Sequence, residues 1–464
     1  MTPIYAQSTP REKYLFHVFC TETALRQEPG SDSFEGTFWS VDVPQACHAH
    51  PAVWHSALAI ASMQTRPRAV CTRGHGAAQP CADDDAAFKQ YTKAIGHLMR
   101  ATQNTHPSFQ DQSLILMATV LLLGFASLRG NFNEVKFFAG HGIRLFTNWR
   151  FRDEAETWKS SARSNLISVT SLISLLDHLL VQYTWACKAS DLPRQAYTTS
   201  AAPKRPFQSM TEAHHEYQAL QLHRFELLRA RALGSVTGDW RPFRYFHEAW
   251  LARSSAWKDK LAQTRRQSEH QGDDAPLRPS LILQMGLVGL QICAQVGPGT
   301  DELYWDRFAS KFRRIVDIAE RIFHGKTDSR GQRPARPVFT FGPSQLGVLY
   351  MVASACRERA TRARTLALLQ GLKQRDGLLD SGLFAALSEA KMRIEETGRE
   401  LVGLAEPKTC TCIPREYICR HHRVRDVGIE FLDSGLARLD IQTFDGDDAQ
   451  APRTKSLTVR WNGS

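Results

Sequence analysis

The sequence predicts an all-α protein, with a large multi-helix body and a small β tail at its C-terminal end. Through most of the 464 residues, apolar side chains recur every three or four positions, which is the spacing of amphipathic helices. Near the end, the pattern changes to an alternation of apolar and polar residues, which is typical of strands. We expect the helical body over 11–405, and a linker with the β tail over 406–464.

Two segments show the helical pattern most clearly. In "TDELYWDRFASKFRRIVDIAERIFHG", from Thr300 to Gly325, six apolar residues form one stripe on a helix. The most apolar run, "LILMATVLLLGFASL", covers 114–128. It is shorter than the roughly 20 residues that a membrane span needs, so we expect a buried core helix there. A loop with three prolines, near 190–208, is expected to join two helical layers.

Three segments of the last part of the chain read as strands. They are "VGIEF" at 427–431, "ARLDIQTF" at 437–444 and "SLTVRW" at 456–461. Each alternates apolar and polar side chains, and turn-forming residues separate them. The sequence therefore predicts a small β tail made of these strands.

The composition is that of a globular protein, with 42% hydrophobic and 23% charged residues. The net charge of +11 is spread along the chain in short basic patches and forms no dense basic arm. The sequence shows no secretory signal, and it contains ten cysteines. We therefore expect reduced thiols in a cytosolic or nuclear compartment.

The stretch "KTCTCIPREYICRHHRV", residues 408–424, concentrates residue types that zinc favours. Our interpretation is a metal-free linker that enters the β tail. Cys410 and Cys412 are separated by one residue instead of the two that a zinc cluster has, and no second half of such a cluster follows. The alternative is a single zinc site of Cys410, Cys412 and Cys419, with His421 or, in its place, His422. Adjacent residues of a strand point to opposite faces, so only one of the two histidines could join.

The motifs of common enzymes are missing from the sequence. It contains no Gly-x-Gly-x-x-Gly, no phosphate-binding loop of the full pattern Gly-x-x-x-x-Gly-Lys-Ser/Thr and no Gly-x-Ser-x-Gly elbow. We expect no enzymatic activity, no catalytic residues and no cofactor. The alternative is a helical enzyme or ligand-binding protein of secondary metabolism, whose site would be assembled from residues far apart in the sequence.

Several segments, taken in order, resemble one family. They are "YTKAIGHLMR", "GNFNEVKFFAGHGIRLF", "LYMVASACRERATRARTLALLQ" and "IPREYICRHHRVRDVGIEF". Each is weak alone, but their order is similar to that of the regulatory region of fungal zinc-cluster transcription factors, also called the middle homology or fungal-specific transcription factor domain. The resemblance covers residues 11–461, and its most specific piece is the third segment.

The resemblance implies a nuclear transcriptional regulator or co-regulator with an all-α regulatory domain, which controls a metabolic or secondary-metabolite gene set. The family's two-zinc, six-cysteine DNA-binding cluster is missing, since no Cys-x2-Cys occurs in the chain. We expect DNA to be reached only indirectly or through an upstream cluster. Direct contact through Arg420, Arg423 and Arg425, or through the loop from Arg330, is a further alternative.

The same resemblance implies partners for the helical body. We expect a homodimer or a complex with proteins of the transcription machinery, in the nucleus and without a membrane. A small-molecule effector would bind in an apolar cavity between helical layers.

Overall fold

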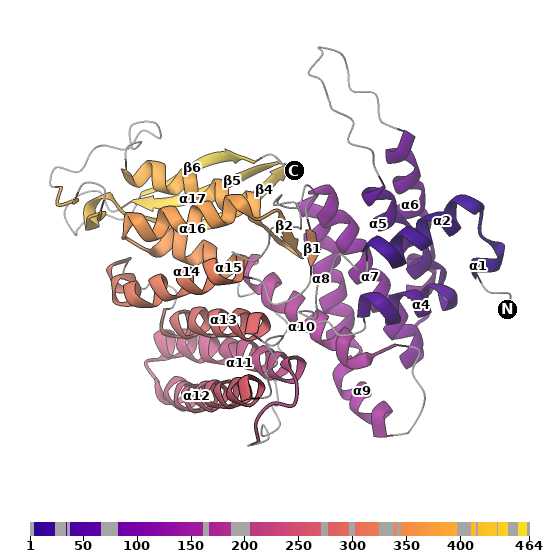
Figure 1. The fold of residues 1–464 in the computed structure, drawn as a ribbon, viewed down its shortest axis with the longest axis horizontal. Helices are drawn as coiled ribbons and strands as arrows, with labels where there is room; N and C mark the ends of the chain where they lie inside the picture. The colour runs from indigo at the N-terminus through magenta and orange to yellow at the C-terminus, as the bar shows by residue number, and fades with distance from the viewer. Residues whose placement is uncertain are drawn as a thin grey trace, which may run out of the picture. The chain divides into compact units, whose positions relative to one another are not determined.

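The computed structural model describes most of the chain and confirms the all-α class with a β tail (Figure 1). The described residues are 4–23, 34, 38–65, 82–160, 167–186, 205–270, 277–296, 302–323, 338–340, 345–396, 410–413, 416–433, 435–443 and 453–461. The loop from Arg330 and most of the proline-containing loop lie outside them.

The chain divides into two compact units, which are described separately. Unit 1 comprises Met1–Gln195 with Val338–Gly342, and unit 2 comprises Ala196–Pro337 with Pro343–Ser464. The boundary after Gln195 falls within the loop where the layer junction was expected. The β tail does not form a unit of its own, because it belongs to unit 2 together with the last helices.

Unit 1 is helical apart from one short strand. Its elements are α1 (Ile4–Gln7), α2 (Pro10–Val18), the π-helix η1 (Phe19–Thr23), the π-helix η2 (Phe38–Asp42), α4 (Val43–Ala49), α5 (Pro51–Gln64), α6 (Ala82–Thr102), α7 (Phe109–Arg129), α8 (Phe132–Asn148), α9 (Phe151–Ser160), α10 (Val169–Ala186) and the strand β1 (Val338–Thr340).

Helix α7 is the core helix of unit 1. Ser108 begins it with a capping box, in which the Ser108 hydroxyl accepts the Asp111 N–H. Gly130 ends it in the left-handed region, at φ 73°. The helix is long and apolar enough to cross a membrane, but 89% of its most apolar window is buried inside the protein. This burial agrees with the core helix predicted from the run at 114–128.

The turn between α7 and α8 begins the segment "GNFNEVKFFAGHGIRLF", residues 130–146. After Gly130, the Asn131 side chain caps α8 by accepting the Glu134 N–H. Within α8, a Cβ at Gly140 would lie 2.9 Å from the Tyr183 hydroxyl, and a Cβ at Gly142 would lie 3.2 Å from Thr119. Glycine therefore allows α8 to approach its neighbours closely.

Unit 2 contains the remaining helices and the C-terminal sheet. Its elements are α11 (Met210–Thr237), α12 (Arg241–His270), α13 (Leu277–Gln295), the 3₁₀-helix η4 (Glu302–Phe308), α14 (Ala309–Phe323), α15 (Leu346–Ala355), α16 (Arg359–Gly371), β2 (Gln374–Asp376), β3 (Leu379–Asp380), α17 (Ser381–Glu396), the 3₁₀-turn η6 (Arg420–His422), β4 (Val424–Asp433), β5 (Leu436–Thr443) and β6 (Arg453–Arg460).

The elements of unit 2 are stacked in layers (Figure 1). Helix α11 packs between α12 and α13, and α14 follows on the other side of α13. Helices α15, α16 and α17 pack against one another above α14, and the sheet covers α17. The segment predicted as one helix from Thr300 begins as η4 and continues as α14.

The C-terminal sheet is an antiparallel meander in the order β4-β5-β6. The three predicted strand segments correspond to its three strands. Along β5, Ala437, Leu439 and Ile441 are buried on alternate positions, as the period of a strand requires. Gly435 turns the chain between β4 and β5 at φ 84°.

A buried carboxylate ties α2 to α6 in unit 1. The Gln90 side-chain amide donates to Glu12 at 3.1 Å, and the Lys93 ammonium donates to the same oxygen at 3.2 Å. Burial alone would raise the pKa of Glu12, but these hydrogen bonds and one from the Thr9 backbone outweigh it and lower the pKa from 4.5 to about 2.

This carboxylate makes the stability of unit 1 depend on pH. Since its folded pKa is lowered, its contribution is complete above pH 4.5 and is lost as the pH falls to about 2. We expect Glu12→Gln to lower the melting temperature at neutral pH, and the difference from wild type to disappear near pH 2. Circular dichroism melts across this range measure it. The exposed Glu248→Gln is the control and should leave the pH profile unchanged. A constant difference for Glu12→Gln at all pH values would contradict the assignment.

Candidate metal centre

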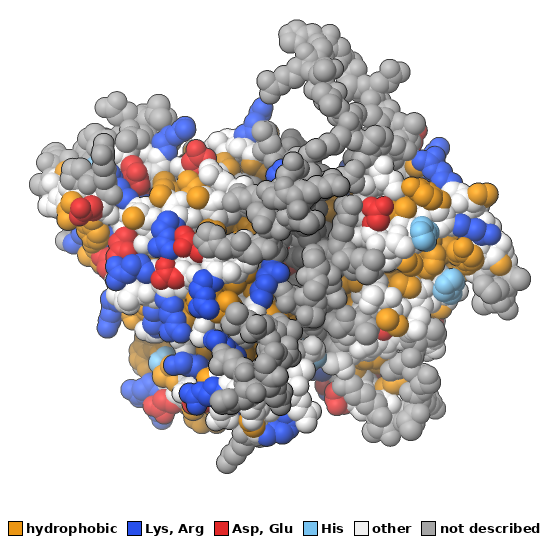
Figure 2. Space-filling view, in the orientation of Figure 1, with side chains coloured by type: hydrophobic (Ala, Val, Ile, Leu, Met, Phe, Trp, Pro, Cys, Tyr) orange, Lys and Arg blue, Asp and Glu red, His pale blue; other side chains and the backbone are white. Residues whose placement is uncertain are grey.

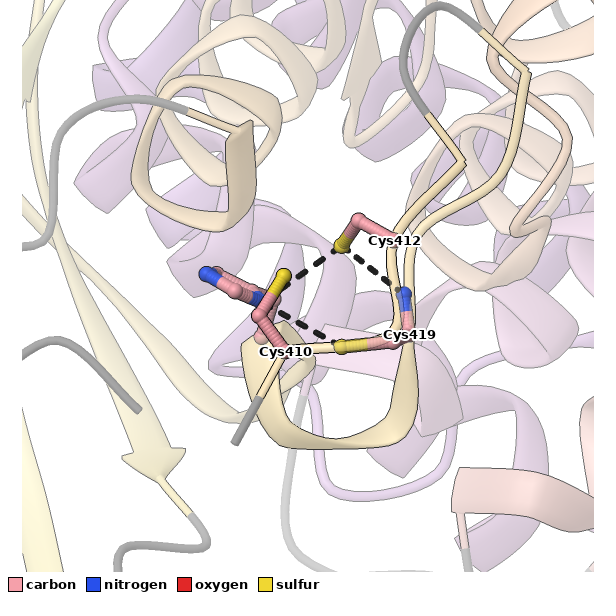
Figure 3. Close-up of side chains that lie close together, drawn as sticks. Cys410, Cys412 and Cys419 are labelled. Carbon is pink, nitrogen blue, oxygen red and sulfur yellow. Dashed lines mark hydrogen bonds between the residues drawn. The ribbon is translucent and has the colours of Figure 1, made fainter. Parts of the chain in front are cut away.

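Four zinc-type ligands of unit 2 lie together at the entrance to the β tail. The ligand atoms of Cys410, Cys412, Cys419 and His422 all lie within 4.8 Å of one another. Figure 3 shows the three cysteines close together on neighbouring stretches of the loop. Among the described residues, this is the only group of three or more His, Cys, Asp or Glu side chains with such a geometry.

A tight turn brings the first cysteines to the third. The Ile413 N–H donates to the Tyr417 carbonyl, and the Tyr417 N–H donates back, each at 3.0 Å. These two hydrogen bonds fold the chain back on itself, so Cys412 lies opposite Cys419. The Cys419 N–H then donates to the Cys412 sulfur at 3.2 Å. The hydrogen bond holds that sulfur in place as an acceptor.

The histidine reaches the same point through the 3₁₀-turn η6. In such a turn, residues three apart lie on one face. His422 follows Cys419 by three positions, and its N–H donates to the Cys419 carbonyl at 3.3 Å. Its Nδ1 lies 3.3 Å from the Cys419 sulfur and 3.5 Å from the Cys412 sulfur. His421 is exposed and does not belong to the group.

The environment of the two inner thiols differs. Burial raises the pKa of Cys412 to about 11. Burial also acts to raise the pKa of Cys419, but hydrogen bonds with His422, with the Thr411 backbone and with Cys412 outweigh it and lower the pKa to about 5. The Cys419 side chain is buried, whereas that of Cys410 is exposed. A thiolate is the form of cysteine that binds a metal.

This geometry differs from the sequence interpretation in two respects. The stretch does lead into the β tail, but as a folded loop that gathers its cysteines. The fourth ligand type comes from His422, whereas His421 was the first choice. Residues 421 and 422 were expected to be part of a strand. They lie in a 3₁₀-turn instead, and the side chain that faces Cys419 is that of His422.

Arg423 is not available to nucleic acid, contrary to its place among the candidates for DNA contact. Its side chain is 3% exposed and pairs with Glu302 at 3.1 Å and with Asp306 at 3.3 Å. It also donates to the Ala355 carbonyl at 2.8 Å. Of the other two candidates, Arg420 is exposed and Arg425 is half-buried on β4. On the face drawn in Figure 2, basic side chains of the described residues are interspersed with acidic ones.

A second buried arginine, Arg357, pairs with the same carboxylate of Asp306. Arg357 donates to Asp306 and to the Ile418 carbonyl, the latter at 2.8 Å. The Tyr417 hydroxyl also donates to Asp306, at 3.4 Å. We call Glu302, Asp306, Arg357 and Arg423 the arginine–carboxylate framework. It holds the loop against η4 and the α15–α16 turn.

Backbone pairing reinforces the framework on both sides of the loop. The Arg359 N–H donates to the Glu416 carbonyl at 2.9 Å, and the Ile418 N–H donates to the Arg357 carbonyl at 3.2 Å. Where β4 begins, the Val424 N–H donates to the Glu395 carboxylate at 3.0 Å. Glu395 is itself paired with the buried Arg362 at 2.6 Å. No local sequence pattern indicated these acidic partners, which lie far from the loop in the chain.

Comparison with known proteins identifies no family for this chain. The sequence matches no model of a known protein family, and its comparison with curated proteins and with solved structures gives no significant match.

We expect Arg423→Ala to destabilise the protein by about 3–5 kcal/mol, because it leaves Glu302 buried without its cation. The matched control is Arg420→Ala, three residues earlier and exposed, which should change the stability by less than about 0.5 kcal/mol. Denaturant unfolding of both variants measures the difference. Equal, small effects would show that the buried pairing contributes little.

Proposed function

We propose that this protein is a regulator of transcription that acts through its helical body. The order of segments that resembles the regulatory region of fungal zinc-cluster transcription factors is the starting point. The all-α fold with a β tail has the architecture that this resemblance implies. The comparisons give no family match. The support for the proposal therefore comes from the contacts that the resembling segments make with one another in the structure.

The observation that carries the proposal is the junction between two of those segments. "LYMVASACRERATRARTLALLQ" contributes Arg357 and the Ala355 carbonyl, and "IPREYICRHHRVRDVGIEF" contributes the Ile418 carbonyl and Arg423. Arg357 donates to Ile418 and Arg423 donates to Ala355, so the two segments hold each other in unit 2. Two segments that are weak motifs when taken separately therefore form one structural junction. This contact supports the interpretation that both belong to one type of domain.

The proposed role follows from what the described surface offers. We infer that DNA is reached through a partner protein or an additional DNA-binding module, since Arg423 is used internally. The helical body would then contact a second copy of the chain or a protein of the transcription machinery, in the nucleus. A small molecule bound within the body would be the effector of this contact.

The test is a tethering experiment in a fungal reporter strain. The full chain is fused to an unrelated DNA-binding domain whose sites lie upstream of a reporter gene. We expect reporter expression to change severalfold when the chain is tethered. The DNA-binding domain alone, at equal abundance, is the control.

The location of the untethered chain gives a second, independent readout. Nuclear enrichment of the fluorescently tagged protein is expected. Cytosolic retention together with an unchanged reporter would contradict the proposal and favour the alternative, a helical enzyme or ligand-binding protein of secondary metabolism.

A further inference from the structure

We propose that Cys410, Cys412, Cys419 and His422 bind one Zn²⁺ ion, which acts as a structural clip for the loop that leads into the β tail. The inference is independent of the proposed role in transcription, because it depends only on the geometry of the loop.

The distances between the ligand atoms fit tetrahedral zinc. With Zn–S bonds of about 2.3 Å and a Zn–N bond of about 2.0 Å, tetrahedral angles place sulfur about 3.5 Å from nitrogen. The His422 Nδ1 lies 3.3 Å from the Cys419 sulfur and 3.5 Å from the Cys412 sulfur. All four ligand atoms lie within 4.8 Å of one another, so small inward shifts of the side chains would complete the tetrahedron.

The donor set selects the metal class. Three thiolates and one imidazole favour zinc over magnesium or calcium, which prefer oxygen ligands. Four protein ligands leave no open position for water or substrate, as in structural rather than catalytic zinc sites. The Cys419 N–H that donates to the Cys412 sulfur is the kind of outer hydrogen bond that orients a metal-binding thiolate.

A disulfide and a nucleophilic cysteine–histidine pair are two other roles for the cluster, and each explains the positions of fewer of its four side chains. A disulfide would use two of the three cysteines and would give His422 no reason to face both inner sulfurs. A nucleophilic Cys419–His422 pair would need an accessible sulfur, but Cys419 is only 1% exposed. A metal ion uses all four side chains together.

The ligands are placed where a bound ion would close the loop. Between Cys412 and Cys419 in the chain lie Glu416, Tyr417 and Ile418, whose backbone pairs with residues 357–359. His422 immediately precedes Arg423, which is buried in the arginine–carboxylate framework. Binding of zinc would therefore clip the two ends of the stretch together and favour the position in which Arg423 meets its partners.

The test measures metal content and stability of the full chain, produced with added zinc and purified under reducing conditions. We expect one equivalent of zinc per chain by elemental analysis. Replacement by Co²⁺ should give the absorption bands of tetrahedral cobalt–thiolate coordination. His422→Asn removes one of the four ligands and should lower the zinc content. The matched control His421→Asn, at the exposed neighbour, should keep the full equivalent.

Cys410→Ser provides a second variant, because this side chain is exposed and its replacement leaves the core intact. It should weaken zinc binding and remove the cobalt–thiolate bands of three-sulfur coordination, with an unchanged circular dichroism spectrum. Removal of zinc by a chelator should lower the melting temperature of wild type and of His421→Asn, but not that of His422→Asn.

Three results would overturn the proposal. One is a folded wild-type chain that holds no zinc and gives no cobalt–thiolate bands. Another is a disulfide between two of the three cluster cysteines, found as a linked peptide in a non-reducing digest. The third is equal zinc content in His422→Asn and His421→Asn, which would place the metal elsewhere.

Discussion

The attachment of the loop in unit 2 depends on one interaction, in which the buried Arg357 and Arg423 meet the partly exposed Asp306. Each charge taken out of water costs several kcal/mol unless it is paired and hydrogen-bonded, so these groups tolerate only the arrangement in which every partner is present. The two arginines come from opposite sides of the loop junction, and the acid comes from η4. One small set of charges therefore fixes the loop to η4 and to the α15–α16 turn, directly before the sheet begins.

This constraint explains why a three-stranded sheet is stable as a tail. A short antiparallel sheet has little core of its own and needs a helix to cover its apolar face. The buried face of β5 provides the apolar contact, and α17 covers the sheet. The Glu395 carboxylate that accepts the Val424 N–H sits between the framework and the first strand. The proposed zinc site lies directly before this point, so metal binding and strand docking would favour each other.

Much of this fold could be predicted from local patterns. The strands were predictable because alternation survives in short segments, and α7 was predictable because a long apolar run without charges is typical of a buried helix. The site was only half predictable. The cysteines were visible in the sequence, but the choice of His422 over His421 depends on a 3₁₀-turn that no residue pattern signals. Arg423 looked like a surface charge because its partners, Glu302 and Asp306, are distant in the chain and meet it only after folding.

The arginine–carboxylate framework fixes the loop to the helical layer as one cooperative unit. Native-state hydrogen exchange tests it most directly, through the Ile418 and Val424 amides, which donate to Arg357 and Glu395. We predict that both amides open with the same free energy as amides within α15 and α17. Exchange of Ile418 and Val424 at the rate of an exposed loop, while α15 and α17 stay protected, would contradict this claim.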